Sequence, residues 1–120
     1  MATAPKKSKA AGWTKGLNEM EVREALDDAT VDCHDHDEQH SGLLTMIQEQ
    51  VEFPFQAKVL DEVVSVVGME WPEGDEFGLD LVCERNGKRH RIEARSVELV
   101  EPFPAGHLFL AAYLEWKRLV

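Results

Sequence analysis

The chain lacks several features that would place it in a large functional class. No apolar run approaches the roughly 20 residues needed to span a bilayer, and the first residues lack the apolar stretch of a secretory signal. The sequence also contains no phosphate-binding loop, no nucleophile elbow and no HExxH motif. We therefore expect a cytoplasmic protein that has no membrane-spanning segment and is not an enzyme.

Cysteine is scarce, because only Cys33 and Cys83 occur among the 120 residues. They form no CxxC pair, so the usual structural zinc motif and the thioredoxin motif are both absent. Cytoplasmic thiols are kept reduced, which makes a disulfide between the two unexpected. The cysteine content therefore does not indicate a small disulfide-stabilised protein or a zinc finger.

Positive charge is scarce outside the first residues of the chain. The sequence has 13 Lys and Arg against 23 Asp and Glu, a net charge of −10. Residues 1–16 contain four lysines and no acid, so residues 17–120 carry a net charge of −14. We expect a disordered basic tail over 1–16 and a single acidic domain over 17–120. Such an acidic domain is not expected to bind nucleic acid, and we expect a monomer.

The strongest signal is the acidic run at residues 31–40, VDCHDHDEQH, which contains no Lys or Arg. Its carboxylates repel one another unless a cation lies among them, so the run predicts a cation site. Carboxylate oxygens favour hard ions such as Ca²⁺. The side chains that offer three or four such ligands are Asp32, Asp35, Asp37 and Glu38. The simpler alternative is a solvated acidic loop whose last acids favour the N-terminus of the next helix.

An EF-hand does not explain the run. Counted from Asp35, the sixth position should be Gly and the twelfth Glu, but they are His40 and Met46. Counted from Asp32, the third and fifth positions are histidines. Any calcium site here must therefore have another architecture.

A second acidic segment follows later in the chain and predicts supporting ligands or a second metal site. Its candidate ligands are Glu73, Asp75, Glu76 and Asp80. Asp80 also has another interpretation, because the Asn86-Gly87 hairpin places it opposite Glu93. Like charges in that position cost stability, so we favour relief by Arg91 or Arg95 over a cation site.

A transition-metal site is an alternative to calcium, since imidazole and thiolate favour Zn²⁺ or Ni²⁺. The candidate ligands are Cys33, His34, His36 and His40. His36 and His40 would share a helix face only if the following helix began early. Cys33 fits better as a small buried apolar residue.

A metal-free interaction module is a further alternative, because an SH3-like barrel can present an aromatic groove to a peptide. The aromatic candidates for such a groove are Trp71, Phe77, Phe103 and Trp116. We favour core packing for each of them, so the sequence alone does not select this function.

The helices are indicated by capping residues and by apolar spacing. Asn18 with Glu21 forms a capping pattern before a helix over 19–29, and Ser41 precedes a second helix over 42–52. A final helix, apolar in its first two turns, is expected over 107–119. The acidic run is thereby predicted to be a loop between two helices.

The segment after Pro54 is rich in strand-forming residues. Strands are expected over 55–60, 63–67, 79–85 and 88–95, with a short one over 96–100. Asn86-Gly87 is a strong hairpin signal and places Arg85 opposite Lys88, Cys83 opposite His90 and Asp80 opposite Glu93. The fold class is therefore α+β, with a small curved antiparallel sheet or SH3-like partial barrel between two leading helices and a C-terminal helix.

The motif Val-Asp-Cys-x-Asp-x-Asp-Glu-x-x-Ser-Gly at residues 31–42, followed by an apolar helix, Phe-Pro-Phe and a strand-rich half, supports a more specific comparison. Over about residues 28–100 the chain resembles a small family of prokaryotic calcium-binding proteins that includes the calcium buffer controlling heterocyst differentiation in cyanobacteria. The resemblance implies a non-EF-hand Ca²⁺ buffer or sensor with a signalling role. By motif position it implies Asp32, Asp35, Asp37 and Glu38 as oxygen ligands.

Overall fold

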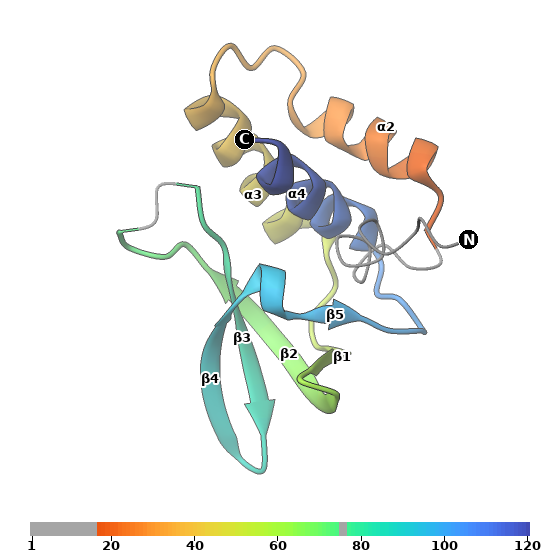
Figure 1. Ribbon diagram of the computed structural model, residues 1–120, viewed down its shortest axis with the longest axis vertical. Helices are drawn as coiled ribbons and strands as arrows, with labels where there is room; N and C mark the ends of the chain where they lie inside the picture. The colour runs from red at the N-terminus through yellow and green to blue at the C-terminus, as the bar shows by residue number, and fades with distance from the viewer. Residues whose placement is uncertain (1–16, 75–76) are drawn as a thin grey trace, which may run out of the picture.

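The structure is a computed structural model in which residues 17–74 and 77–120 are described. The tail predicted over residues 1–16 lies outside the described residues. In the described part of the chain, two helices lead into a five-stranded sheet, and a final helix follows it (Figure 1). The elements in chain order are α2 (Glu19–Ala29), α3 (His36–Gln50), β1 (Phe55–Val59), β2 (Glu62–Glu70), β3 (Asp80–Arg85), β4 (Lys88–Glu93), the 3-10 turn η2 (Ala94–Ser96), β5 (Glu98–Leu99) and α4 (His107–Leu119).

Helix α2 has the bounds that the sequence predicts. The side chain of Asn18 accepts hydrogen bonds from the backbone N–H of Met20, at 2.8 Å, and of Glu21, at 3.3 Å. These bonds satisfy two of the N–H groups that a helix leaves free at its start. The helix buries Val22, Ala25 and Ala29 on its inner face.

Helix α3 begins at His36, so the predicted start near residue 42 was wrong. The N-cap is Asp35, whose Oδ1 accepts from the Glu38 N–H at 2.9 Å. The Glu38 carboxylate in turn accepts from the His34 N–H at 2.6 Å. Acidic side chains are also favoured by the partial positive charge at a helix N-terminus. Half of the acidic run is therefore the first turn of a helix rather than a loop.

The sheet has the predicted α+β arrangement and is curved and open. Its strand order is β4-β3-β2-β1-β5, with every neighbouring pair antiparallel. The hairpin register is confirmed for Arg85 with Lys88 and for Cys83 with His90. The strand bounds differ from the predicted ones, since β2 extends to Glu70, β4 gives way to η2 after Glu93, and β5 is only two residues long.

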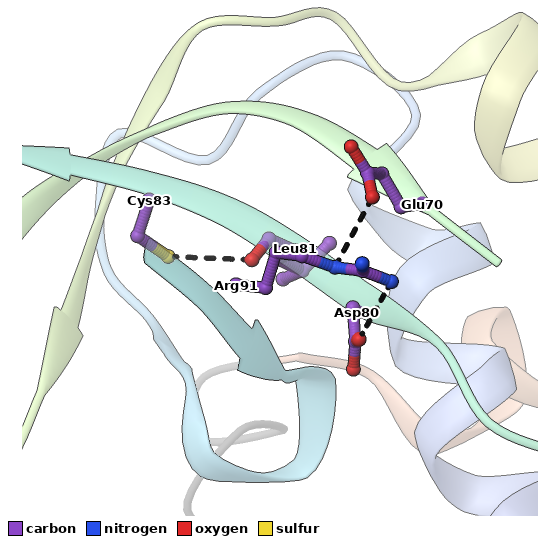
Figure 2. A network of polar contacts seen from close by, with 5 residues as sticks. All are labelled: Glu70, Asp80, Leu81, Cys83 and Arg91. Atoms are coloured by element: carbon purple, nitrogen blue, oxygen red, sulfur yellow. Dashed lines mark hydrogen bonds and ion pairs between the residues drawn. The ribbon is translucent and has the colours of Figure 1, made fainter. Parts of the chain in front are cut away.

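The predicted opposition of Asp80 and Glu93 is present and is relieved by arginine, as favoured. Arg91 lies between two acids, with 3.3 Å from Nη2 to the Asp80 carboxylate and 3.1 Å from Nε to Glu70 (Figure 2). Arg95 pairs with Glu93 at 2.9 Å. Each acid of the opposed pair thus has its own guanidinium, and no cation is needed to explain the pairing.

The main core lies where the helices meet one end of the sheet. Leu43, Leu44 and Ile47 from α3 are fully buried, and α4 adds the buried residues 110–114. Figure 1 shows α2, α3 and α4 grouped together, with the β3–β4 hairpin extending away from them. No helix among the described residues is long and apolar enough to cross a membrane.

Candidate functional site

The four predicted carboxylate ligands gather where the α2–α3 connection enters α3. Asp32 lies in the connection with a left-handed backbone, φ 64°, and Asp35 is the N-cap. Asp37 and Glu38 belong to the first helical turn. All four residues are exposed. The structure thus places them within one short segment that opens to solvent.

Two of the four carboxylates already perform a structural task. Asp35 and Glu38 each use one oxygen to accept a backbone N–H. Each retains a second oxygen, and within the described part of the chain the Asp32 and Asp37 side chains take part in no hydrogen bond or ion pair. Hard oxygen donors are the ligands Ca²⁺ prefers, so the donor set fits this ion chemically. Over residues 17–74 and 77–120, however, no three His, Cys, Asp or Glu side chains are already arranged to hold a metal.

The backbone beneath these carboxylates is held by close packing of α3 on the end of α2. A Cβ added at Gly42 would clash with the backbone oxygen of Ala29. Cys33 makes two hydrogen bonds. Its N–H donates to the backbone oxygen of Thr30 at 3.0 Å, and its thiol donates to the backbone oxygen of Glu38 at 3.4 Å. The connection is therefore tied to both helices.

The histidines take a different role from the carboxylates. Because α3 begins early, His36 and His40 are one turn apart on one face. His40 is 8% exposed, and its ring stacks on Trp116 with centroids 5.9 Å apart. Its Nε2 lies 2.8 Å from the Gly78 carbonyl oxygen, which can only accept, so this nitrogen carries the proton. His40 thus serves the aromatic packing, which weakens the transition-metal alternative.

Two further hydrogen bonds join α4 to α3 and to the segment after β2. The Trp116 indole N–H donates to the Gln39 side-chain oxygen at 2.8 Å. The Tyr113 hydroxyl donates to the Phe77 carbonyl at 2.7 Å. Phe77 also lies edge-on to His36, with centroids 6.0 Å apart. Both ends of the second acidic segment are thereby held beside α3, since Trp71 at its start packs against His40.

The predicted supporting ligands have mixed positions. Glu73 is exposed within the segment held beside α3. Asp75 and Glu76 lie outside the described residues. Asp80 is ion-paired with Arg91 and lies at the start of β3. The structure therefore brings the region of Glu73 near the first acidic segment and gives Asp80 another partner.

Three of the four aromatic candidates for a peptide groove pack against other residues, whereas Trp71 is 45% exposed. Trp116 is buried, Phe77 packs on it, and Phe103 stacks on His107. Sequence reasoning missed the linking role of Gln39 and His40. Two signals in the sequence could have indicated it. The Asp35-x-x-Glu38 capping pattern predicts that the helix begins at residue 36, and the four-residue spacing of His36 and His40 then places both on one helix face.

Comparison with known proteins gives one informative result. The chain matches no protein-family profile and no curated protein. Among solved structures it is similar to the crystal structure of Anabaena CcbP, with a TM-score of 0.66. The match covers 83% of this chain and 90% of that chain at 18% sequence identity. At that identity the similarity establishes a shared fold.

Proposed function

We propose that the protein binds calcium ions and acts as a Ca²⁺ buffer or sensor without catalytic activity. The observation that carries the proposal is the set of four exposed carboxylates at residues 32–38, which have no cationic partner among the described residues. The similarity in fold to CcbP, a calcium-binding protein, supports the same function.

This set differs from the acids on the first four strands of the sheet, several of which have an arginine partner. On the sheet, acids are matched by arginines, with Glu62 paired to Arg85 and Glu84 paired to Arg89. Asp80 and Glu70 share Arg91. Among the described residues, the acidic run has no ion pair, and the N-terminus of α3 is what offsets its charge. The helix supplies roughly half an elementary positive charge at its N-terminus, which four carboxylates outweigh.

The ligand count is sufficient for calcium. Ca²⁺ takes about six to eight oxygens in a flexible geometry. Asp32 and Asp37 offer both carboxylate oxygens, and Asp35 and Glu38 offer one each while keeping their backbone bonds. Backbone carbonyls and water would complete the shell. Because the side chains are not preassembled, binding must order them, which lowers the affinity relative to a rigid site.

The proposal is tested by calorimetric titration of chelator-stripped protein with Ca²⁺, Mg²⁺ and Zn²⁺ in parallel. Saturable Ca²⁺ binding in the micromolar range or tighter, retained in excess Mg²⁺, is the expected result. The matched control is Glu84→Gln, which removes one partly exposed carboxylate from the sheet and should leave binding unchanged. Zn²⁺ binding without Ca²⁺ binding would contradict the proposal, as would the absence of heat with all three ions.

A further inference from the structure

A second feature of the surface lies on the sheet, away from the acidic segment. A hollow of about 430 Å³ opens between the β1–β2 turn and the β3–β4 hairpin. Its apolar lining comes from Val59, Val64, Cys83 and Ile92. Burial raises the pKa of the Cys83 thiol, so this side chain is neutral near pH 7 and adds to the apolar lining. The hollow lies where the buried face of the sheet reaches solvent.

The charges on the β3–β4 hairpin are sorted between its two faces. Arg85, Lys88 and His90 share the face that carries the buried Leu81 and Cys83, and all three line the hollow. The opposite face carries both signs, as its Glu84–Arg89 ion pair shows. The hairpin face around the apolar opening thus carries basic side chains and no acid.

These basic groups are only partly neutralised. Among the described residues, Glu62 is the single acid that lines the hollow, and it pairs with Arg85, both side chains being about half exposed. In the described part of the chain, no acid pairs with the side chains of Lys88 or His90. This is an exception on a domain whose residues 17–120 carry a net charge of −14.

Apolar surface continues beyond the hollow onto the β1–β2 turn. Leu60 is 92% exposed and lines the edge of the hollow. A leucine this exposed at the edge of an apolar opening adds surface that a bound chain can cover. The combined surface is an apolar strip with cations along one side.

We propose that this surface, defined by Leu60, Val64, Arg85, Lys88, His90 and Ile92, docks an acidic segment of a partner protein. An apolar side chain of the partner enters the hollow, and neighbouring carboxylates pair with Lys88 and compete with Glu62 for Arg85. Charge complementarity selects this occupant. The chain's own residues 1–16 carry four lysines and no acid, so they would be repelled. A polypeptide is favoured over a small ligand because the apolar strip runs out of the hollow across Leu60.

The test uses three fluorescein-labelled 12-residue peptides and the full chain. The first is acidic with a central Leu-Phe pair, the second is acidic with Ser-Ser at that place, and the third is basic with Leu-Phe. Anisotropy titrations should show binding of the first peptide only. Its NMR footprint should fall on the methyl groups of Val59, Val64 and Ile92.

Matched variants locate the contacts. Lys88→Gln and Arg89→Gln remove the same charge from adjacent positions on opposite faces of β4. We expect Lys88→Gln to weaken binding about three- to tenfold and Arg89→Gln to change it less than twofold, since a pairing charge acts mainly at its own contact. Leu60→Asn should also weaken binding, and its left-handed backbone, φ 52°, suits asparagine.

Several outcomes would overturn the proposal. Equal effects of Lys88→Gln and Arg89→Gln would show only general attraction between charges. A footprint outside the hollow, or no binding of the acidic Leu-Phe peptide at millimolar concentration, would refute it. Concentration-dependent dimerisation in sedimentation that is lost in Lys88→Gln would assign the surface to a second copy of the chain instead of a partner.

Discussion

Replacing both Asp35 and Asp37 by asparagine should abolish calcium binding while leaving the fold intact. Asp35 accepts the Glu38 N–H at 2.9 Å through one side-chain oxygen, and asparagine keeps an oxygen at that position. Asparagine and aspartate are nearly equal as N-caps. The Asp37 side chain is exposed and takes part in no hydrogen bond or ion pair with a described residue, so its neutralisation breaks no contact there.

The magnitudes separate binding from stability. Loss of two negative charges at a helix N-terminus costs about 0.3–1 kcal/mol each, but it also removes repulsion among the four carboxylates. We therefore expect the free energy of unfolding to change by less than about 1 kcal/mol. The Asp35→Ala variant loses the cap itself, at about 0.5–2 kcal/mol. A loss of 1 kcal/mol lowers the Tm of a domain of this size by about 4–8 °C.

Thermal unfolding and calcium calorimetry on the same samples measure both quantities. The Asp35→Asn/Asp37→Asn protein should melt near the unmodified protein and give no calcium heat, whereas Asp35→Ala should melt earlier. Unchanged calcium binding in the double variant would refute the ligand assignment. Early melting of the double variant would refute the claim that the cap depends on the side-chain oxygen of Asp35 and the metal site on its negative charge.

Three further perturbations test the framework around the site. Replacing Gln39 by alanine leaves the indole N–H of Trp116 without its acceptor and should cost about 1–3 kcal/mol in urea unfolding, while Gln39→Glu keeps an acceptor and should cost less. Gly42→Ala should destabilise the fold by about 1–3 kcal/mol, because the clash with the backbone of Ala29 exceeds the roughly 1 kcal/mol gain in helix propensity. The control is Gly68→Ala, which should be tolerated because a Cβ added there meets nothing within 4 Å. Burial raises the pKa of Cys83 above its ordinary value of 9.0, so the neutral thiol favours the folded state. This contribution to stability is fully present below pH 9.0 and is lost as the pH rises above it, and the corresponding part of the slope of stability against pH should vanish in Cys83→Ala. An unchanged slope would contradict the burial argument.

The elements that sequence predicted best were those with complete local signals. Asn18 fixed the start of α2, and Asn86-Gly87 fixed the register of the hairpin along its whole length. The start of α3 was missed because carboxylate repulsion favoured a loop. In the structure the Asp35 cap and the helix N-terminus offset that repulsion.

The surroundings of the site could not be predicted from local patterns. The His40–Gly78 and Gln39–Trp116 bonds join residues 38 and 77 positions apart, and no periodicity within α3 indicates either partner. The sequence also could not predict that basic side chains surround the hollow. The burial of Cys83 and the exposure of Lys88, which only the structure gives, show where the core ends. Composition identified the carboxylates, whereas tertiary packing decided which neighbours they have.

The most direct test of the calcium site is an NMR titration of the ¹⁵N-labelled protein that follows the backbone amides of His34 and Glu38. Both amides donate to the carboxylates proposed as ligands. Our account predicts that both signals shift saturably with Ca²⁺, in excess Mg²⁺ as well, while the amides at the tip of the β3–β4 hairpin stay in place. Calcium binding that leaves the amides of residues 32–38 unchanged would contradict it.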